Sequence, residues 1–431
     1  MDSEKKQQRR DVLKIIGGTA AGLVIGGVAG WSGGQASVPT GPPVTFTTTA
    51  TKPALSGDIP IGIIHAAPIE VGPETPAIEM ALADINDYVA QNTNVPVKFT
   101  FLEENAEESA TKAVERAKTL IDRGAQVIVG SEWSSHCRAL LPLMNERQVV
   151  LISQSSSSPS LSIPDDYLFR LQPDDTQESL CVRRMTVDLG MKGVIVVYAK
   201  EAYGEGLYKE MVKKWGESGV EVLMALGIDP EKKEFIAEFG EVDAAYKEAL
   251  KKYKQDEIGI YLFGTYGPDI PALTSLAKYP DLLNARVFDS DNGGAPGYVQ
   301  YAGDIAAQVQ FTAFAFGPSA HPKFKVWVKR YMDKTGFEPY FTAYSTYDCL
   351  WLAALSVLAT QNYNGAAIKK IVPTIADLYF GATGWTELNE NGDRKYPTYN
   401  IYRIVKEGGE AKWKTVGFYD GISDSITWAK S

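Results

Sequence analysis

The hydrophobic pattern of this chain alternates, from Ile59 onward, between short apolar runs and longer stretches of helical period. The first four apolar runs, rich in β-branched and aromatic residues, occupy 59–66, 97–103, 126–132 and 149–155. Between these runs, apolar residues recur at the i, i+3, i+4 and i+7 spacing of amphipathic helices. Strands that are apolar on both faces and joined by helices form a parallel sheet covered on both sides. The pattern therefore predicts an α/β fold with parallel sheets.

The same pattern starts again after a polar stretch at 171–179. Further strand candidates lie at 193–199, 220–228, 258–264, 285–291 and 308–316, and helix candidates at 203–217, 237–254, 322–335 and 343–360. Because a single hydrophobic core stops growing at roughly 250–300 residues, a chain of 431 residues is expected to form two. We predict two Rossmann-like lobes with parallel sheets, joined by a hinge.

Each lobe is expected to take two segments of the chain. Lobe one is predicted to comprise 58–175 and about 312–378, and lobe two 176–311 and about 379–431. The segment from Tyr379 onward is rich in aromatic residues and is predicted to be irregular.

The first 31 residues have the composition of an export signal. Basic residues up to Lys14 precede a charge-free apolar run at 15–31, and the string RRDVLK at 9–14 resembles a twin-arginine signal. Residues 32–57 are rich in Ser, Thr, Pro and Gly, which is typical of a flexible linker. The protein is therefore expected outside the cytoplasm, in the periplasm or at the cell surface. Two alternatives stand for residues 1–31, cleavage or retention as a membrane anchor, because the apolar run has the minimum length of a bilayer span.

Charge and composition exclude several other functions. A formal net charge of −10 without a basic patch argues against a nucleic-acid partner. The three histidines share no metal-ligand spacing, and neither a Ser-His-Asp arrangement nor a phosphate loop is present, so no enzyme activity, metal or cofactor is expected.

The cysteines at positions 137, 181 and 349 are an odd number and lie far apart in the sequence. Each lies among apolar residues on a predicted helix, which favours three small core side chains. The alternative is one disulfide plus a free thiol. No cysteine precedes Cys137, so the chain offers no attachment site for a bacterial lipoprotein anchor.

Polar residues follow several strand candidates at the carboxyl ends where parallel sheets bind ligands. The segment GSEWSSHC at 130–137 places Ser134 at an expected helix start, and QSSSSPS at 154–160 contains a run of four serines. Helix N-termini and serine hydroxyls donate hydrogen bonds to anions, so a carboxylate fits there. In lobe two, Tyr203 in KEAYGEG and Asp291 in FDSDNGG could supply an aromatic lid and a partner for an ammonium group. The alternative is that each residue only caps a helix or a turn.

These segments resemble the leucine/isoleucine/valine-binding protein family of ABC importers, which has the periplasmic-binding-protein type I fold. The resemblance runs from about residue 59 to the end of the chain, and it includes similar segments at 339–349 and 381–394. It implies that Ser134 and Ser157 bind the α-carboxylate of an amino acid, while Ser155 offers its backbone carbonyl to the ammonium group. It also implies that Tyr203 stacks on the ligand and that Asp291 pairs with the ammonium group.

Two residues depart from the family pattern and bear on ligand choice. Trp133 precedes Ser134 where a small residue is usual, and Asp291 is shorter than the Glu common in branched-chain binders. The side-chain pocket is expected to include Trp133, Tyr266 and Phe316. The alternative is that these aromatic residues at strand ends belong to the hydrophobic core.

The resemblance implies an extracytoplasmic solute-binding protein that closes its two lobes on an amino acid, branched-chain or related, and delivers it to an ABC permease. Buried charges must be paired, so serine donors and Asp291 would engage both ends of the ligand only when the lobes are closed. Two alternatives remain. The first is a ligand without an α-amino group, such as urea, a short amide or an aromatic carboxylate. The second is a ligand-sensing receptor ectodomain.

Overall fold

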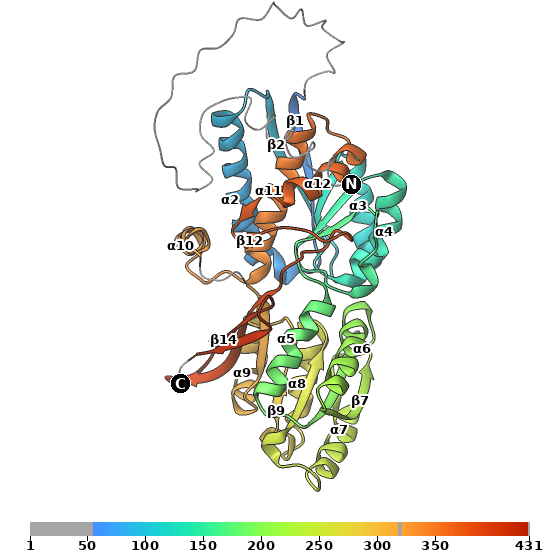
Figure 1. Ribbon diagram of the computed structural model, residues 1–431, viewed down its shortest axis with the longest axis vertical. Coiled ribbons are helices and arrows are strands. Elements are labelled where there is room, and N and C mark those ends of the chain that lie inside the picture. The colour runs from blue at the N-terminus through green and yellow to red at the C-terminus, as the bar shows by residue number, and fades with distance from the viewer. Residues whose placement is uncertain (1–54, 318–320, 430–431) are drawn as a thin grey trace, which may run out of the picture.

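The computed structural model describes residues 55–317 and 321–429. It contains two α/β lobes stacked along the long axis of the molecule (Figure 1). The predicted export signal at 1–31, and most of the predicted linker, lie outside these residues. Within the described ranges, no helix has the length and apolar character needed to cross a membrane.

The sheet of lobe one has five parallel strands in the order β2-β1-β3-β4-β5. The strands are β1 (Gly57–His65), β2 (Val97–Asn105), β3 (Val127–Gly130), β4 (Val150–Ser153) and β5 (Leu168–Arg170). Strands β3 and β4 are buried along their whole length, as parallel strands between two helix layers must be. The first four strand candidates are therefore confirmed. The three-residue strand β5 was not predicted, because it is too short to produce a hydrophobic pattern.

Helices from both halves of the sequence cover this sheet. They are α2 (Pro68–Asn92), α3 (Ala110–Asp122), α4 (Ser134–Arg147), α11 (Phe341–Thr360) and α12 (Gly365–Ala376). Helix α10 (Pro322–Thr335) packs against α2, and the short 3₁₀ helix η1 (Pro159–Leu161) contacts α4. Helix α11 packs between α2 and the strands β3 and β4, and nearly all of its residues are buried. Its apolar sequence is explained by this position in the core of lobe one.

The sheet of lobe two has eight strands in the order β15-β14-β13-β10-β9-β8-β6-β7. The strands are β6 (Gly193–Ala199), β7 (Glu221–Ile228), β8 (Ile258–Phe263), β9 (Arg286–Phe288), β10 (Thr312–Phe316), β13 (Thr398–Glu407), β14 (Glu410–Asp420) and β15 (Ser425–Trp428). The first five are parallel to one another, and the last three extend the sheet in antiparallel fashion. The strand candidates of the second repeat are thus confirmed.

The helices of lobe two lie on both faces of its sheet (Figure 1). They are α5 (Asp175–Asp188), α6 (Ala202–Glu217), α7 (Ile236–Ala249), α8 (Tyr266–Leu276) and α9 (Pro296–Gln308). Two short elements complete lobe two, η2 (Gln255–Glu257) and η3 (Leu282–Asn284). Strands β11 (Phe380–Gly381) and β12 (Gly384–Trp385) form a separate two-stranded sheet, and Ala382 and Thr383 between them donate from their backbone N–H groups to Asp348 on α11. The start of the segment predicted for lobe two, about 379–431, therefore packs on lobe one.

The C-terminal segment differs from the sequence expectation. It was predicted to be irregular, but β13 and β14 form a long hairpin that pairs with β10. Gly408 and Gly409 lie between the two strands at φ angles of 64° and 89°, the left-handed conformation that tight hairpin turns require. Strand β10, placed by the predicted boundary at the start of a lobe-one segment, belongs to the sheet of lobe two. The chain therefore returns to lobe one after Phe316.

The three cysteines lie on helices and in the hydrophobic core, as the sequence pattern predicted. Cys137 on α4, Cys181 on α5 and Cys349 on α11 are fully buried, and their thiols are free. The interpretation as core side chains is confirmed.

Candidate functional site

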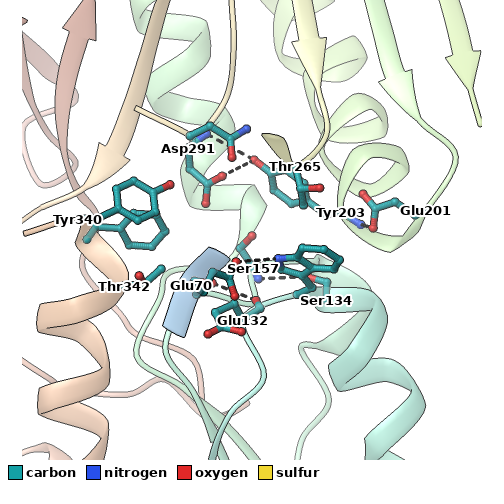
Figure 2. A pocket seen from close by; sticks show the side chains of 14 residues that line it. Glu70, Glu132, Ser134, Ser157, Glu201, Tyr203, Thr265, Asp291, Tyr340 and Thr342 are labelled. Atoms are coloured by element: carbon teal, nitrogen blue, oxygen red, sulfur yellow. Dashed lines mark hydrogen bonds between the residues drawn. The ribbon is translucent and has the colours of Figure 1, made fainter. Parts of the chain in front are cut away.

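A pocket lies between the two lobes, at the carboxyl ends of strands from both sheets (Figure 2). Its space amounts to about 490 Å³, part of which is open to solvent. Lobe one contributes Glu70, Glu132, Trp133, Ser134, Ser155 and Ser157. Lobe two contributes Glu201, Tyr203, Thr265, Asp291 and Asn292. The start of α11 adds Tyr340, Phe341 and Thr342.

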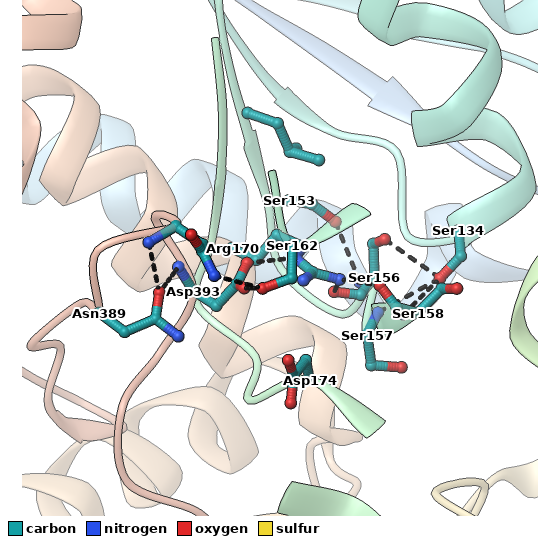
Figure 3. A network of polar contacts seen from close by, with 12 residues as sticks. Ser134, Ser153, Ser156, Ser157, Ser158, Ser162, Arg170, Asp174, Asn389 and Asp393 are labelled. Atoms are coloured by element: carbon teal, nitrogen blue, oxygen red, sulfur yellow. Dashed lines mark hydrogen bonds and ion pairs between the residues drawn. The ribbon is translucent and has the colours of Figure 1, made fainter. Parts of the chain in front are cut away.

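The predicted serines of lobe one, Ser134, Ser155 and Ser157, all line the pocket. Figure 3 shows Ser134 beside the loop that follows β4. Ser134 is the first residue of α4, and its Oγ accepts hydrogen bonds from the backbone N–H groups of Ser157 (3.2 Å) and Ser158 (3.1 Å). The Ser155 hydroxyl donates to the backbone carbonyl of Glu132 at 3.0 Å. Ser134 Oγ also lies 3.1 Å from Ser156 Oγ, so this hydroxyl ties the loop after β4 to the start of α4. These contacts join the loop after β3 and the loop after β4 into one surface.

A buried arginine lies beneath the serine loop (Figure 3). Arg170 Nη1 donates to the backbone carbonyls of Ser156 (3.3 Å) and Ser158 (2.9 Å), and its Nε donates to Asp393 Oδ1 at 2.5 Å. The Arg170 side chain is fully buried and that of Asp393 is 1% exposed. Asp393 Oδ2 also accepts from the Ser162 hydroxyl at 2.6 Å. A distant part of the sequence therefore holds the serine loop in place.

Trp133 lies at the N-cap position of α4 and gives this helix no side-chain cap. No capping side chain therefore accepts hydrogen bonds from the first backbone N–H groups of α4. This end of the helix borders the pocket. The indole of Trp133 lines the pocket and donates from Nε1 to Glu70 Oε1 at 3.3 Å. Helix N-termini of this kind favour negatively charged groups.

The two predicted residues of lobe two are in direct contact. The Tyr203 hydroxyl on α6 lies 2.8 Å from Asp291 Oδ1, after β9, and 3.0 Å from Glu178 Oε1 on α5. One hydroxyl proton serves only one of these oxygens, so the second contact requires a protonated carboxyl group. Burial, and to a smaller extent repulsion from Asp291, raises the pKa of Glu178 well above its usual range. Burial also raises the pKa of Asp291 to about 7.

A glycine allows Tyr203 to take this position. A Cβ atom on Gly204, in the first turn of α6, would lie 2.5 Å from the carbonyl oxygen of Ala199 and 2.6 Å from that of Phe263. We expect Gly204→Ala to displace the start of α6, to lower the free energy of unfolding by about 1–3 kcal/mol and to weaken ligand binding. Chemical denaturation and calorimetric titration would measure the two effects.

The matched control is Gly216→Ala at the other end of the same helix, where a Cβ atom would meet nothing within 4 Å. This substitution is expected to leave binding unchanged and not to lower stability. Equal losses in the two variants would contradict the packing role of Gly204.

The other predicted pocket residues have different outcomes. Tyr266 is the first residue of α8, and its side chain lies outside the described part of the structure. Phe316 is buried in β10, with the Arg394 guanidinium 4.6 Å from its ring centroid, and is not among the residues that line the pocket.

Sequence reasoning missed about half of the pocket. Three of the missed residues, Glu132, Glu201 and Asn292, lie inside segments that were selected for other residues. Glu70 follows the carboxyl end of β1, and the rule that ligands bind at the carboxyl ends of parallel strands would also have indicated this segment. The start of α11 gave only a helix signal, because its approach to the pocket depends on tertiary packing. The missed residues are Glu70, Glu132, Glu201, Thr265, Asn292, Tyr340, Phe341 and Thr342.

A buried His-Glu pair lies close to Glu132, one of the residues that line the pocket. His65 Nδ1 is 2.8 Å from Glu74 Oε2, and its Nε2 is 3.1 Å from Glu103 Oε2. Hydrogen bonds to these carboxylates outweigh burial and raise the pKa of His65 to about 10. His65, Glu74 and Glu132 offer ligand atoms within 4.8 Å of one another. Both ring nitrogens of His65 are engaged by carboxylates, so we interpret the cluster as an internal network of ion pairs.

Two Rossmann-like lobes with a pocket between their strand ends define a two-lobed binding protein of the periplasmic type I class. A crystal structure of a leucine-binding protein from Thermotoga maritima has this fold, with a TM-score of 0.69 and 17% identity, over 83% of this chain and 98% of that one. The family model described as receptor family ligand binding region matches residues 73–407. The chain belongs to this family, and the predicted resemblance to leucine/isoleucine/valine-binding proteins is confirmed.

Relatives are found in archaea and bacteria. An uncharacterised protein of Methanocaldococcus jannaschii is 25% identical over 373 residues, which are 81% of this chain and 86% of the relative. A leucine-, isoleucine-, valine-, threonine- and alanine-binding protein of Pseudomonas aeruginosa is 22% identical over 306 residues, 70% of this chain and 78% of that protein.

Proposed function

We propose that this protein is an extracytoplasmic solute-binding protein that captures an amino acid and delivers it to the permease of an ABC importer. One observation carries the proposal: donors for a carboxylate and an acceptor for an ammonium group face each other across one pocket. The donors are the serine loops and the N-terminus of α4 in lobe one, and the acceptor is Asp291 in lobe two.

Each lobe supplies one half of the binding site in this proposal. The ligand's α-carboxylate lies against Ser134 and Ser157, and Ser155 offers its carbonyl oxygen to the ammonium group. On the other side, Asp291 pairs with the ammonium group and Tyr203 covers the ligand. A buried charge without a partner costs several kcal/mol, so both ends of a zwitterion are satisfied only when the lobes come together. Ligand binding and closure are then one event.

The hinge is proposed to lie where the chain passes between the two sheets. These passages follow β5, follow β10 and precede β13. We also keep the proposal that residues 1–31 direct export, which would place the pocket outside the cytoplasm, where an importer collects its solute.

A thermal-shift screen of the purified protein tests the proposal. An amino acid at 100 times its Kd is expected to add about 2.7 kcal/mol to the free energy of unfolding. Free amino acids should raise the melting temperature, and their deaminated analogues should not. Equal stabilisation by both would contradict the ammonium site. Turnover of a stabilising compound, followed by NMR, would contradict a pure binding function.

A further inference from the structure

Two carboxyl groups contact one tyrosine hydroxyl in lobe two. Tyr203 Oη lies 2.8 Å from Asp291 Oδ1 and 3.0 Å from Glu178 Oε1, and Figure 2 shows the contact with Asp291. Burial raises the pKa of Tyr203 well above its usual range, so its hydroxyl keeps its proton. Because that proton serves only one of the two contacts, the other contact needs a proton from a carboxyl group.

The position of Glu178 favours it as the carboxyl group that keeps this proton. Glu178 is fully buried and is not among the residues that line the pocket, whereas Asp291 lines it. A charge costs more free energy the further it lies from water, so the proton belongs on the deeper of the two groups. The directions of the pKa shifts agree. The pKa of Glu178 is raised well above its usual range, chiefly by burial, and that of Asp291 to about 7.

The groups around Glu178 favour its neutral form. The titratable groups that face it come from four parts of the fold: Asp175 and Cys181 on α5, Tyr203 on α6, Asp291 after β9 and Tyr399 on β13. Burial raises the pKa of the Cys181 thiol and of the Tyr399 hydroxyl well above their usual ranges, so both stay neutral. The cation Arg170 acts on Asp175 and is itself paired with Asp393. Repulsion from the neighbouring acids therefore adds to the effect of burial.

We propose that Glu178 is a positioning residue of the ammonium site: its protonated carboxyl group donates to Tyr203 Oη, and the Tyr203 hydroxyl in turn donates to Asp291 Oδ1. This inference rests on the proposed function, since Asp291 is there the partner of the ligand's ammonium group. Glu178 does not touch the ligand and acts through Tyr203.

The direction of these hydrogen bonds prepares Asp291 for a cation. A hydroxyl that donates to a carboxylate favours the ionised form of that carboxylate. With its proton committed to Asp291, Tyr203 needs a donor for its own oxygen, and the carboxyl group of Glu178 supplies one. Because Tyr203 occupies Oδ1 of Asp291, Oδ2 is the oxygen that Asp291 offers to the ammonium group.

Two substitutions of Glu178 test the inference in the full chain. The probe is whichever of the common amino acids gives the largest thermal shift with the wild-type protein, and its affinity is measured by calorimetric titration. Glu178→Gln keeps a neutral donor for Tyr203, so affinity should stay within about threefold of wild type and fall at the same pH. Glu178→Leu removes the donor and should weaken binding at least about fivefold. Equal losses in the two variants, or no loss in either, would overturn the inference.

A double-mutant cycle tests whether Glu178 acts through Tyr203. Tyr203→Phe removes the donor to Asp291, so the pKa of Asp291 rises further and affinity should begin to fall at a higher pH than in the wild-type protein. In the Tyr203→Phe background, Glu178→Leu should change affinity by less than about twofold, because the contact that it would break is already gone. Additive losses from the two substitutions would overturn the inference.

Stability measurements separate this role from a structural one. Glu178 Oε2 is buried without a hydrogen-bond partner among the described residues, so Glu178→Leu should not lower the midpoint of chemical denaturation. A large loss of stability would assign Glu178 to the fold and overturn the inference. The control is Glu217→Gln at the other end of α6, whose carboxylate is 54% exposed beside Lys214. This substitution should leave affinity, its pH dependence and stability unchanged.

Infrared difference spectroscopy observes the proton directly. The spectrum of the wild-type protein minus that of Glu178→Gln at neutral pH should contain the C=O stretching band of a protonated carboxyl group. A band of an ionised carboxylate in its place would overturn the inference and leave the proposed function standing, because this measurement needs no ligand. Normal amino-acid binding by Asp291→Asn would overturn the proposed ammonium site, and the inference with it.

Discussion

Asp291→Asn is expected to remove most of the affinity for an amino acid while the empty protein remains folded. The carboxylate lies opposite the serine loops and is the proposed partner of the ligand's ammonium group. Removing one member of a buried charge pair costs about 2–5 kcal/mol of binding free energy. Calorimetric titration with the amino acid that gives the largest thermal shift would measure the loss.

The empty protein is expected to tolerate this substitution because Asp291 lies among other acids. Glu178 and Asp175 lie on α5, Asp289 precedes it in the same loop, and the hydroxyl of Tyr203 contacts it. A neutral amide in this place removes repulsion, so the free energy of unfolding should stay constant or rise. Asp304→Asn is the control, since the Asp304 side chain is 83% exposed. A large loss of stability in Asp291→Asn would assign this residue to the fold instead of the ligand.

The pH dependence of binding distinguishes a charge role from a packing role. Burial raises the pKa of Asp291 to about 7 in the empty pocket, while an ammonium group favours its ionised form. Below this pH the ligand must displace a proton, so affinity should fall by up to about tenfold per pH unit. This dependence should be absent in Asp291→Asn. A wild-type affinity that is constant between pH 5 and 8 would contradict the ammonium contact.

Much of the fold could be predicted because its signals are local. Each buried parallel strand, such as 193–199, is an uninterrupted apolar run, and each crossover helix has its own period. The hairpin of β13 and β14 was missed even though Gly408-Gly409 is a hairpin signal, because aromatic residues obscured its alternation. The lobe to which β10 belongs is set by long-range pairing with β13, which no local pattern contains.

The residues of the candidate site also differ in whether a local sequence signal could identify them. Ser134, Ser157, Tyr203 and Asp291 could be selected because parallel topology brings strand ends together wherever they lie in the sequence. Thr342 could not be selected, since it reaches the pocket from a helix that packs on lobe one. Its position depends on how α11 fits against α2 and the sheet.

Long-range packing also brings together Arg170 and Asp393, and breaking their ion pair is expected to cause a large loss of stability. Both side chains are buried, and Arg170 also donates to two carbonyl oxygens of the serine loop. Asp393→Asn leaves the guanidinium buried without its main counter-charge, which typically costs about 3–5 kcal/mol. We therefore expect a large drop in the free energy of unfolding, measured by chemical denaturation.

A double variant distinguishes the cost of an unpaired buried charge from the loss of the contacts that hold the serine loop. Replacing both partners by apolar residues, Arg170→Met with Asp393→Leu, removes the unpaired charge and should recover much of the stability, because apolar replacements of buried ion pairs are often neutral. The serine loop would still lack its donor, so ligand affinity should remain low. Asp165→Asn is the surface control, since the Asp165 carboxylate is 94% exposed beside Lys369 and should leave the denaturation midpoint unchanged. Full recovery of ligand affinity in the double variant would contradict the role of Arg170 in holding the serine loop.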